Sequence, residues 1–158
     1  MTDNAPVLEV RDLKKHFPIK KGLLRRTVGH VYAVDGITFT INQGETLGLV
    51  GESGCGKTTA GRAVLRLIEP SSGSVKVEGR EITGLSKAEM RPYRRQMQIV
   101  FQDPFRSLNP RRRIGEALIE GPLNYGVPRA EALARARQLL GLVRMDDTAL
   151  ERYPHQFS

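Results

Sequence analysis

Hydrophobic and polar positions alternate near the start of the chain and change to other spacings farther along. Val7–Leu13 alternates apolar and polar residues, as a half-buried strand does, and Ala33–Ile41 predicts a second strand. The stretch Lys14–His30 between them is irregular and basic, so we expect a loop there. Glu45–Val50 is a nearly continuous apolar run, which is typical of a strand buried on both faces.

A glycine-rich turn follows this run, and the spacing then predicts a helix over Lys57–Leu67. We expect a strand at Ser74–Glu78, a short helix at Lys87–Arg95 and another buried strand at Met97–Phe101. Strands surrounding one buried helix therefore make up the first part of the chain.

The pattern becomes helical after Asp103. Arg129–Leu140 predicts a helix, because apolar residues recur there at helical spacing: Leu133, Ala136, Leu140 and Val143. Gly141 is expected as its C-cap, Asp146 as the N-cap of a final short helix, and Pro154 as the residue that ends that helix. We therefore divide the chain into a β-rich part (residues 1–103) and a helical part (residues 104–158) of one domain.

Composition limits the class of protein only loosely. The chain has 158 residues with 25 Lys and Arg against 17 Asp and Glu, a net charge of +8, which suits a polyanionic partner or simply a solvated basic surface. Cys55 is the single cysteine, which excludes an internal disulfide and fits a reducing cytosol. No apolar run is long enough to span a bilayer, and the first residues lack the pattern of a secretory signal.

The segment Gly51-Glu-Ser-Gly-Cys-Gly-Lys-Thr58 matches the phosphate-binding loop pattern G-x-x-x-x-G-K-[ST]. A chance match in a chain of this length has odds of roughly one in a few hundred. The context agrees, because the segment follows a predicted buried strand and opens a predicted helix. A glycine-rich turn with an incidental lysine is the remaining structural interpretation.

These residue types suit a triphosphate. Glycines let the backbone wrap the phosphates, and the helix that follows directs its positive end at them. Lys57 adds a full charge at the β- and γ-phosphates, the Thr58 hydroxyl is a hard ligand for Mg²⁺, and Thr59 can bond an α-phosphate oxygen. Cys55 fills an unspecified position and is expected to have no chemical role. The predicted nucleotide-binding residues of the loop are Gly51, Ser53, Gly54, Cys55, Gly56, Lys57, Thr58 and Thr59.

With the loop in place, the chain resembles ATP-binding subunits of ATP-binding-cassette (ABC) transporters, in particular the oligopeptide and dipeptide importer group, which includes nickel and glutathione importers. The matching stretches are AVDGI from Ala33, GETLGLVGESGCGK from Gly44, FQDPFRSLNP from Phe101 and YPHQFS from Tyr153. The resemblance implies an α/β P-loop NTPase fold of ABC type, here incomplete. It also implies ATP and Mg²⁺ as ligands and a cytoplasmic place beside permease subunits and a second ATP-binding subunit.

The resemblance assigns two further residues. Gln102 would be the glutamine that touches Mg²⁺ and the attacking water, and its loop would contact the permease; with Lys57 it completes the implied catalytic set. Phe17 lies where the family places an aromatic ring against adenine, and Tyr32 competes with it for that role. Core packing is the ordinary interpretation of either ring.

Two groups of basic residues allow two interpretations each: a surface facing the permease or anionic lipid, or a solvated face, which we prefer. They are Arg111, Arg112 and Arg113, and Arg91, Arg94 and Arg95.

Several parts that the family uses for hydrolysis have no counterpart in this sequence. Phe157 and Ser158 resemble the first two residues of the signature loop, and neither a second acidic metal motif nor a switch histidine is found. We therefore expect this chain to hydrolyse ATP negligibly by itself. Because the family's neighbouring parallel strands are also missing, an exposed apolar edge is expected at Glu45–Val50.

Two other classes of protein compete with this interpretation. A P-loop kinase or GTPase would carry a second specificity motif and no FQDP-type segment. A nucleic-acid-binding module is suggested by the charge, but its basic runs lack interleaved aromatic residues.

Overall fold

The computed structural model describes residues 6–23, 25–101 and 107–157. They form two compact units, Met1–Gln98 and Ile99–Ser158, which are considered separately below. The boundary that the sequence predicts, near Asp103, lies outside the described residues. Among the described helices, none is long and apolar enough to cross a membrane.

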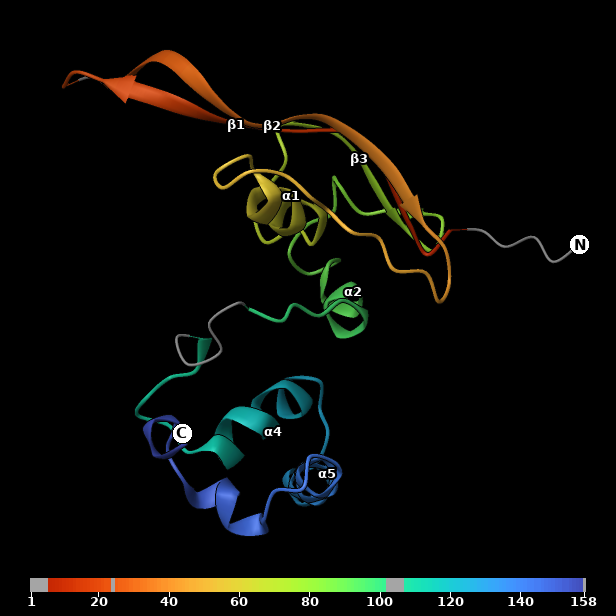
Figure 1. Ribbon diagram of the computed structural model, residues 1–158, viewed down its shortest axis with the longest axis vertical. Coiled ribbons are helices and arrows are strands. Elements are labelled where there is room, and N and C mark those ends of the chain that lie inside the picture. The colour runs from red at the N-terminus through yellow and green to blue at the C-terminus, as the bar shows by residue number, and fades with distance from the viewer. Residues whose placement is uncertain (1–5, 24, 102–106, 158) are drawn as a thin grey trace, which may run out of the picture. The chain divides into compact units, whose positions relative to one another are not determined.

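The first unit is built on an antiparallel sheet of four strands in the order β2-β1-β3-β4 (Figure 1). Its strands are β1 (Leu8–Lys21), β2 (Arg26–Ile41), β3 (Ser72–Val77) and β4 (Arg80–Glu81). A bulge in β1 places Arg11 and Asp12 opposite one residue of β2, and Asp12 has a φ of 44°. The bulge brings Val10 and Leu13, three positions apart, to the same face, where both are fully buried.

The segment Lys14–His30, which the sequence predicts as a loop, is instead part of a long β-hairpin. Lys15 pairs with Val34 and Lys21 with Arg26, so β1 and β2 continue well past the rest of the sheet. This expectation was wrong because β1 and β2 provide each other with backbone hydrogen-bonding partners along this stretch. Such pairing does not require alternating apolar and polar residues, so a basic sequence gives no sign of it.

Helix α1 (Lys57–Val64) lies beside the sheet (Figure 1) and packs against it through Ala63 and Val64. The buried core of the unit joins them to Val10, Leu13, Val75, Val77, Ile82 and Met90. The helix ends three residues before the predicted Leu67, since Arg66 has a φ of 54° and leaves the helical region. The short helix α2 (Arg91–Gln96) begins later than predicted.

Two predicted buried strands are not found among the residues that the structure describes. Glu45–Val50 and Met97–Phe101 have no strand assignment, and Val50 and Val100 are 93% and 95% exposed. A strand exists only through the ladder that it forms with a neighbour, and neither segment has one among the described residues. The exposed apolar character expected of Glu45–Val50 is present, with Leu47 and Leu49 about half exposed.

The second unit is helical, with α4 (Ile114–Asn124), α5 (Arg129–Leu142) and the 3-10 turns η1 (Asp147–Glu151) and η2 (Pro154–Gln156). Its core consists of Ile119, Ala132, Ala136, Leu140, Ala149 and Leu150.

The predicted helix from Arg129 is confirmed, with Ala136 and Leu140 on its buried face. Two details of its end were wrong: Val143 is 63% exposed, and α5 continues through Gly141 to Leu142. Asp146 does cap the next turn, because its side chain accepts a hydrogen bond of 2.7 Å from the Thr148 amide. Pro154 begins η2 rather than ending a helix.

Candidate phosphate-binding site

The glycine-rich loop leads directly into α1, which begins at Lys57. Its N-cap is Gly56, with a φ of 95°, and Gly54 has a φ of 84°. A side chain is strained in this left-handed region, so both positions favour glycine. The first turn of α1 contains no acidic residue, and no side chain caps it. The positive end of the helix is therefore available to an anion.

Close packing adds a second requirement for glycine. A Cβ atom at Gly56 would lie 2.0 Å from the Ala33 carbonyl oxygen of β2, and one at Gly51 would lie 2.6 Å from Cys55 Sγ. Ala33 is the extra residue of a bulge, since Lys15 pairs with Val34 and His16 with Tyr32. The C-terminal half of the loop thus rests against the hairpin. Sequence reasoning missed this role of Ala33, because only strand pairing shows it.

The Lys57 side chain folds back over its own loop. Its Nζ donates hydrogen bonds to the carbonyl oxygens of Gly51 (2.7 Å) and Glu52 (2.6 Å), and Cys55 Sγ is 3.5 Å away. An ammonium group has three donors, and two of them are thus directed at backbone oxygens of the loop. The charge that the sequence assigns to phosphate binding lies within the loop, as that role requires.

The remaining loop residues differ in exposure. Gly51, Ser53, Gly54, Cys55 and Thr58 are exposed, whereas Gly56, Lys57 and Thr59 are half-buried. The Thr58 hydroxyl is accessible to a ligand, and it is a hard oxygen donor of the kind that Mg²⁺ accepts. The described residues contain no group of three or more His, Cys, Asp or Glu that could hold a metal ion. A magnesium ion at Thr58 would therefore take most of its ligands from nucleotide phosphate and water, which is its usual mode of binding.

The two candidate aromatic rings lie in the part of the hairpin that reaches the loop. Phe17 pairs with Val31 and is 40% exposed, with Lys15 Nζ 4.9 Å from its ring centroid. Tyr32, which precedes the contact residue Ala33, is 64% exposed and meets His16 edge to face at 4.5 Å. Neither ring is buried in the core, so both remain open to a flat base.

The remaining sequence predictions concern Gln102 and two groups of basic residues. Gln102 lies outside the described residues. Arg94 does not belong to a solvated face, because its guanidinium donates hydrogen bonds to the Leu65 and Arg66 carbonyls at 2.5 and 2.6 Å, after the end of α1. Arg112 and Arg113 form surface ion pairs with Glu120 and Glu151.

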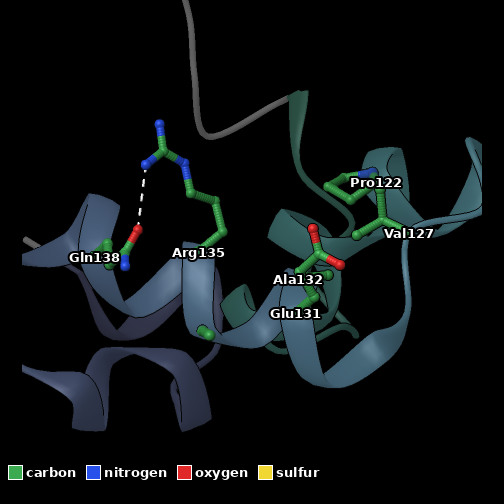
Figure 2. A pocket seen from close by; sticks show the side chains of 7 residues that line it. Pro122, Val127, Glu131, Ala132, Arg135 and Gln138 are labelled. Atoms are coloured by element: carbon green, nitrogen blue, oxygen red, sulfur yellow. Dashed lines mark hydrogen bonds between the residues drawn. The ribbon is translucent and has the colours of Figure 1, made fainter.

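Two cavities lie in the helical unit and contain none of the predicted site residues. One, of about 420 Å³, is lined by a mixed set of side chains from α4, α5 and the segment between them (Figure 2). In it the Arg135 guanidinium donates to Gln138 Oε1 at 3.2 Å, so the cationic side chain of its lining is already engaged. The other, of about 290 Å³, has an entirely apolar lining: Leu108, Ile114, Leu118, Leu140, Met145, Pro154 and Phe157.

Residues 34–158 match the profile of a family described as ABC transporter. Among curated proteins, the oligopeptide transport ATP-binding protein AppF of Bacillus subtilis is 46% identical over 155 residues, which cover 96% of this chain and 47% of AppF. The glutathione import ATP-binding protein GsiA of Escherichia coli O157:H7 is 45% identical over 159 residues, covering 100% of this chain and 26% of GsiA. The chain thus spans about half the length of AppF and about a quarter of GsiA.

Solved structures agree on the fold. A dimeric ATP-binding cassette, MJ0796, in a post-hydrolysis state bound to ADP and phosphate, superposes with a TM-score of 0.77 at 24% identity, covering 96% of this chain and 63% of that one. The CbiO1 protein of Clostridium perfringens superposes with a TM-score of 0.70 at 24% identity, covering 97% and 56%. These likenesses confirm the predicted α/β fold class, including its incompleteness.

Proposed function

Because this chain belongs to the ABC transporter family, we propose that it is the nucleotide-binding part of an ATP-binding subunit that drives import of peptides or a related solute. The observation that carries the proposal is the position of the Lys57 ammonium inside the loop, beside the uncapped start of α1. The names of the relatives, which include peptide and glutathione import, support the solute class. The family match does not favour a P-loop kinase, a GTPase or a nucleic-acid-binding module.

Each loop residue has a part in this proposal. Lys57 exchanges its bonds to the Gly51 and Glu52 carbonyls for bonds to the β- and γ-phosphates, so its charge moves from neutral oxygens to anionic ones. Thr58 supplies a hydroxyl to Mg²⁺, and Thr59 bonds the α-phosphate. The metal ion, when bound, would neutralise charge that develops on the phosphate oxygens. Phe17 or Tyr32 stacks on adenine, a contact worth about 1–3 kcal/mol for a base on an aromatic ring.

Hydrolysis and transport are proposed for the longer assembly. The family supports ATP hydrolysis in general. We propose that Gln102 senses the metal and the attacking water, and that the subunit works at the cytoplasmic face of the membrane with permease subunits and a second ATP-binding subunit. The 158-residue chain is proposed to bind Mg-ATP but to turn it over negligibly. The division into residues 1–103 and 104–158 is kept as a proposal for the two subdomains.

The test is a titration of the chain with Mg-ATP, followed by NMR or calorimetry. Replacing Lys57 with Ala removes a charge-assisted contact worth about 1.5–3 kcal/mol, so we expect the Kd to rise about 10- to 100-fold. Lys87→Ala, at an exposed lysine of the same unit, is the matched control and should leave the Kd unchanged. Equal binding by both variants would refute the assignment, and GTP competing better than ATP would favour a GTPase.

A further inference from the structure

The β1–β2 hairpin extends beyond the body of its own unit. Strand β1 pairs with β3 only as far as Lys14, which lies opposite Ser72. From there to the turn, its described strand partner is β2 alone, and Figure 1 shows the two strands projecting away from the rest of the unit. We call residues 14–32 the arm. A two-stranded ribbon has no core of its own, so its side chains face solvent or a partner.

The charge of the arm has one sign. Residues 14–32 contain no Asp or Glu and six basic residues: Lys14, Lys15, Lys20, Lys21, Arg25 and Arg26. Four of these six belong to the end of the arm, where Lys21 pairs with Arg26 and Lys20 with Thr27. The register therefore brings two dibasic pairs, which the sequence separates by a turn, to one place. Together they make a compact cationic tip, which we define as the described residues 20–23, 25 and 26.

The turn between the pairs carries apolar residues where polar ones are usual. The Arg25 amide donates to the Gly22 carbonyl at 3.0 Å, so the chain turns tightly here, and Leu23 directly follows Gly22 in this turn. Corner positions of turns are dominated by Gly, Pro, Asn, Asp and Ser. Leu23 is 102% exposed, and Val28, in the adjoining bulge, is 58% exposed. The tip thus presents an aliphatic side chain to solvent, flanked by four cations.

We propose that the tip, formed by Lys20, Lys21, Leu23, Arg25 and Arg26, binds the surface of an anionic lipid bilayer. Cations attract anionic headgroups, and an exposed leucine gains free energy by entering the boundary between headgroups and acyl chains. A nucleic acid would also attract the cations, but base recognition relies on aromatic rings, and the tip has none. The contact between the tip and the bilayer is small, so by itself it is a weak attachment. Its effect adds to that of any other contact that holds the protein at the membrane. It is independent of nucleotide binding.

The sequence offers a clean probe, because it contains no tryptophan. In the Leu23→Trp variant of the whole chain, the fluorescence of the single tryptophan reports only the surroundings of the tip. With phosphatidylcholine vesicles containing phosphatidylglycerol, we expect its emission to shift to shorter wavelength and to be quenched by brominated lipid. Leu142→Trp, at a residue 77% exposed in the helical unit, is the control and should show neither change. A change at position 142 and none at position 23 would overturn the proposal.

A sedimentation assay tests the charges. Replacing Lys20, Lys21, Arg25 and Arg26 with Ser should lower the partition onto anionic vesicles by at least about a hundredfold, since each basic residue near a surface contributes roughly a factor of five. The control replaces four exposed basic residues elsewhere: Arg80, Lys87, Arg137 and Arg144. Circular dichroism and Mg-ATP binding should match the wild type in both. Leu23→Ser adds a second, charge-neutral variant, for which we expect a smaller loss.

Three results would contradict the proposal. The first is equal binding to pure phosphatidylcholine and to anionic vesicles. The second is an equal loss in the tip and control variants. The third is binding to single-stranded DNA that needs the tip, with no binding to vesicles, which would assign the tip to nucleic acid. We also expect partition to fall steeply as salt rises, because the Debye length is about 10 Å at 0.1 M.

Discussion

The contact between Gly56 and the hairpin allows a sharp test of how the phosphate loop is held. Gly56 and Gly54 both have positive φ, 95° and 84°. A Cβ added at Gly56 would lie 2.0 Å from the Ala33 carbonyl oxygen, whereas one at Gly54 would meet nothing within 4 Å. Gly56→Ala and Gly54→Ala therefore share the backbone strain, and only the first creates a clash.

The magnitudes follow from these two effects. Placing an L-residue in the left-handed region costs about 1–2 kcal/mol, of which a lower entropy of the unfolded chain returns about 0.4–1 kcal/mol. Gly54→Ala should therefore destabilise the unit by roughly 0–1.6 kcal/mol. At Gly56 the hairpin and the loop must also move apart, and overpacking of this kind typically adds about 1–3 kcal/mol.

Amide hydrogen exchange at buried sheet residues such as Val10 and Val75 reports the stability of the first unit alone. The measurement is made without nucleotide, so ligand binding does not contribute. We expect these amides to exchange faster in Gly56→Ala than in Gly54→Ala, by roughly 5- to 150-fold, which corresponds to the additional 1–3 kcal/mol of the clash. Equal exchange rates in the two variants would show that the loop does not rest on Ala33.

Acid should weaken the first unit through Glu81. Partial burial alone would raise the pKa of its carboxyl group. Hydrogen bonds from the Ser74 and Thr83 hydroxyls and from two backbone amides outweigh this effect and lower the pKa from 4.5 to about 2. The carboxylate thus stabilises the fold fully above pH 4.5, and this contribution is lost as pH falls towards 2. Because Glu81 is exposed, solvent screening leaves about 1 kcal/mol, and urea titrations of Glu81→Gln should show a stability advantage of the wild type that disappears over this window. In the second unit, Ile119 is fully buried, so Ile119→Ala should lower the free energy of unfolding by about 2–5 kcal/mol, whereas no change in urea midpoint would contradict the proposed core.

Local signals explain which parts of the fold could be predicted. The strand near Leu8 and the start of α1 at Lys57 follow from alternation and from the loop motif, and both are found. The arm could not be predicted, because the hairpin partners of its residues lie between 5 positions (Lys21 and Arg26) and 21 positions (Lys14 and Asp35) away, and basic residues have no period. The strand predicted at Glu45–Val50 was wrong for the opposite reason. An apolar composition shows that a segment can be buried, but it does not show that a neighbouring strand is present to bury it.

The residues of the candidate site also fall into those that a local motif identifies and those that only packing between distant segments reveals. The motif identifies Lys57 and Thr58 as residue types suited to phosphate and metal, and the structure places them at the start of α1. The contact of Gly56 with Ala33 and the hydrogen bonds of Arg94 to the carbonyls after α1 depend on packing between distant segments. No local pattern distinguishes Arg94, which acts structurally, from Arg95 beside it, which is exposed.

The loop is anchored unequally on its two sides, and this affects how Lys57 should be interpreted. Its C-terminal half continues into α1 and rests on Ala33, but its N-terminal half follows a segment that pairs with no strand among the described residues. The bonds from Lys57 Nζ to the Gly51 and Glu52 carbonyls join the two halves. Removing Lys57 therefore deletes a charge and also releases the first residues of the loop, so that binding must order them again. Loss of affinity beyond the roughly 100-fold expected for one charge-assisted contact would measure that second effect.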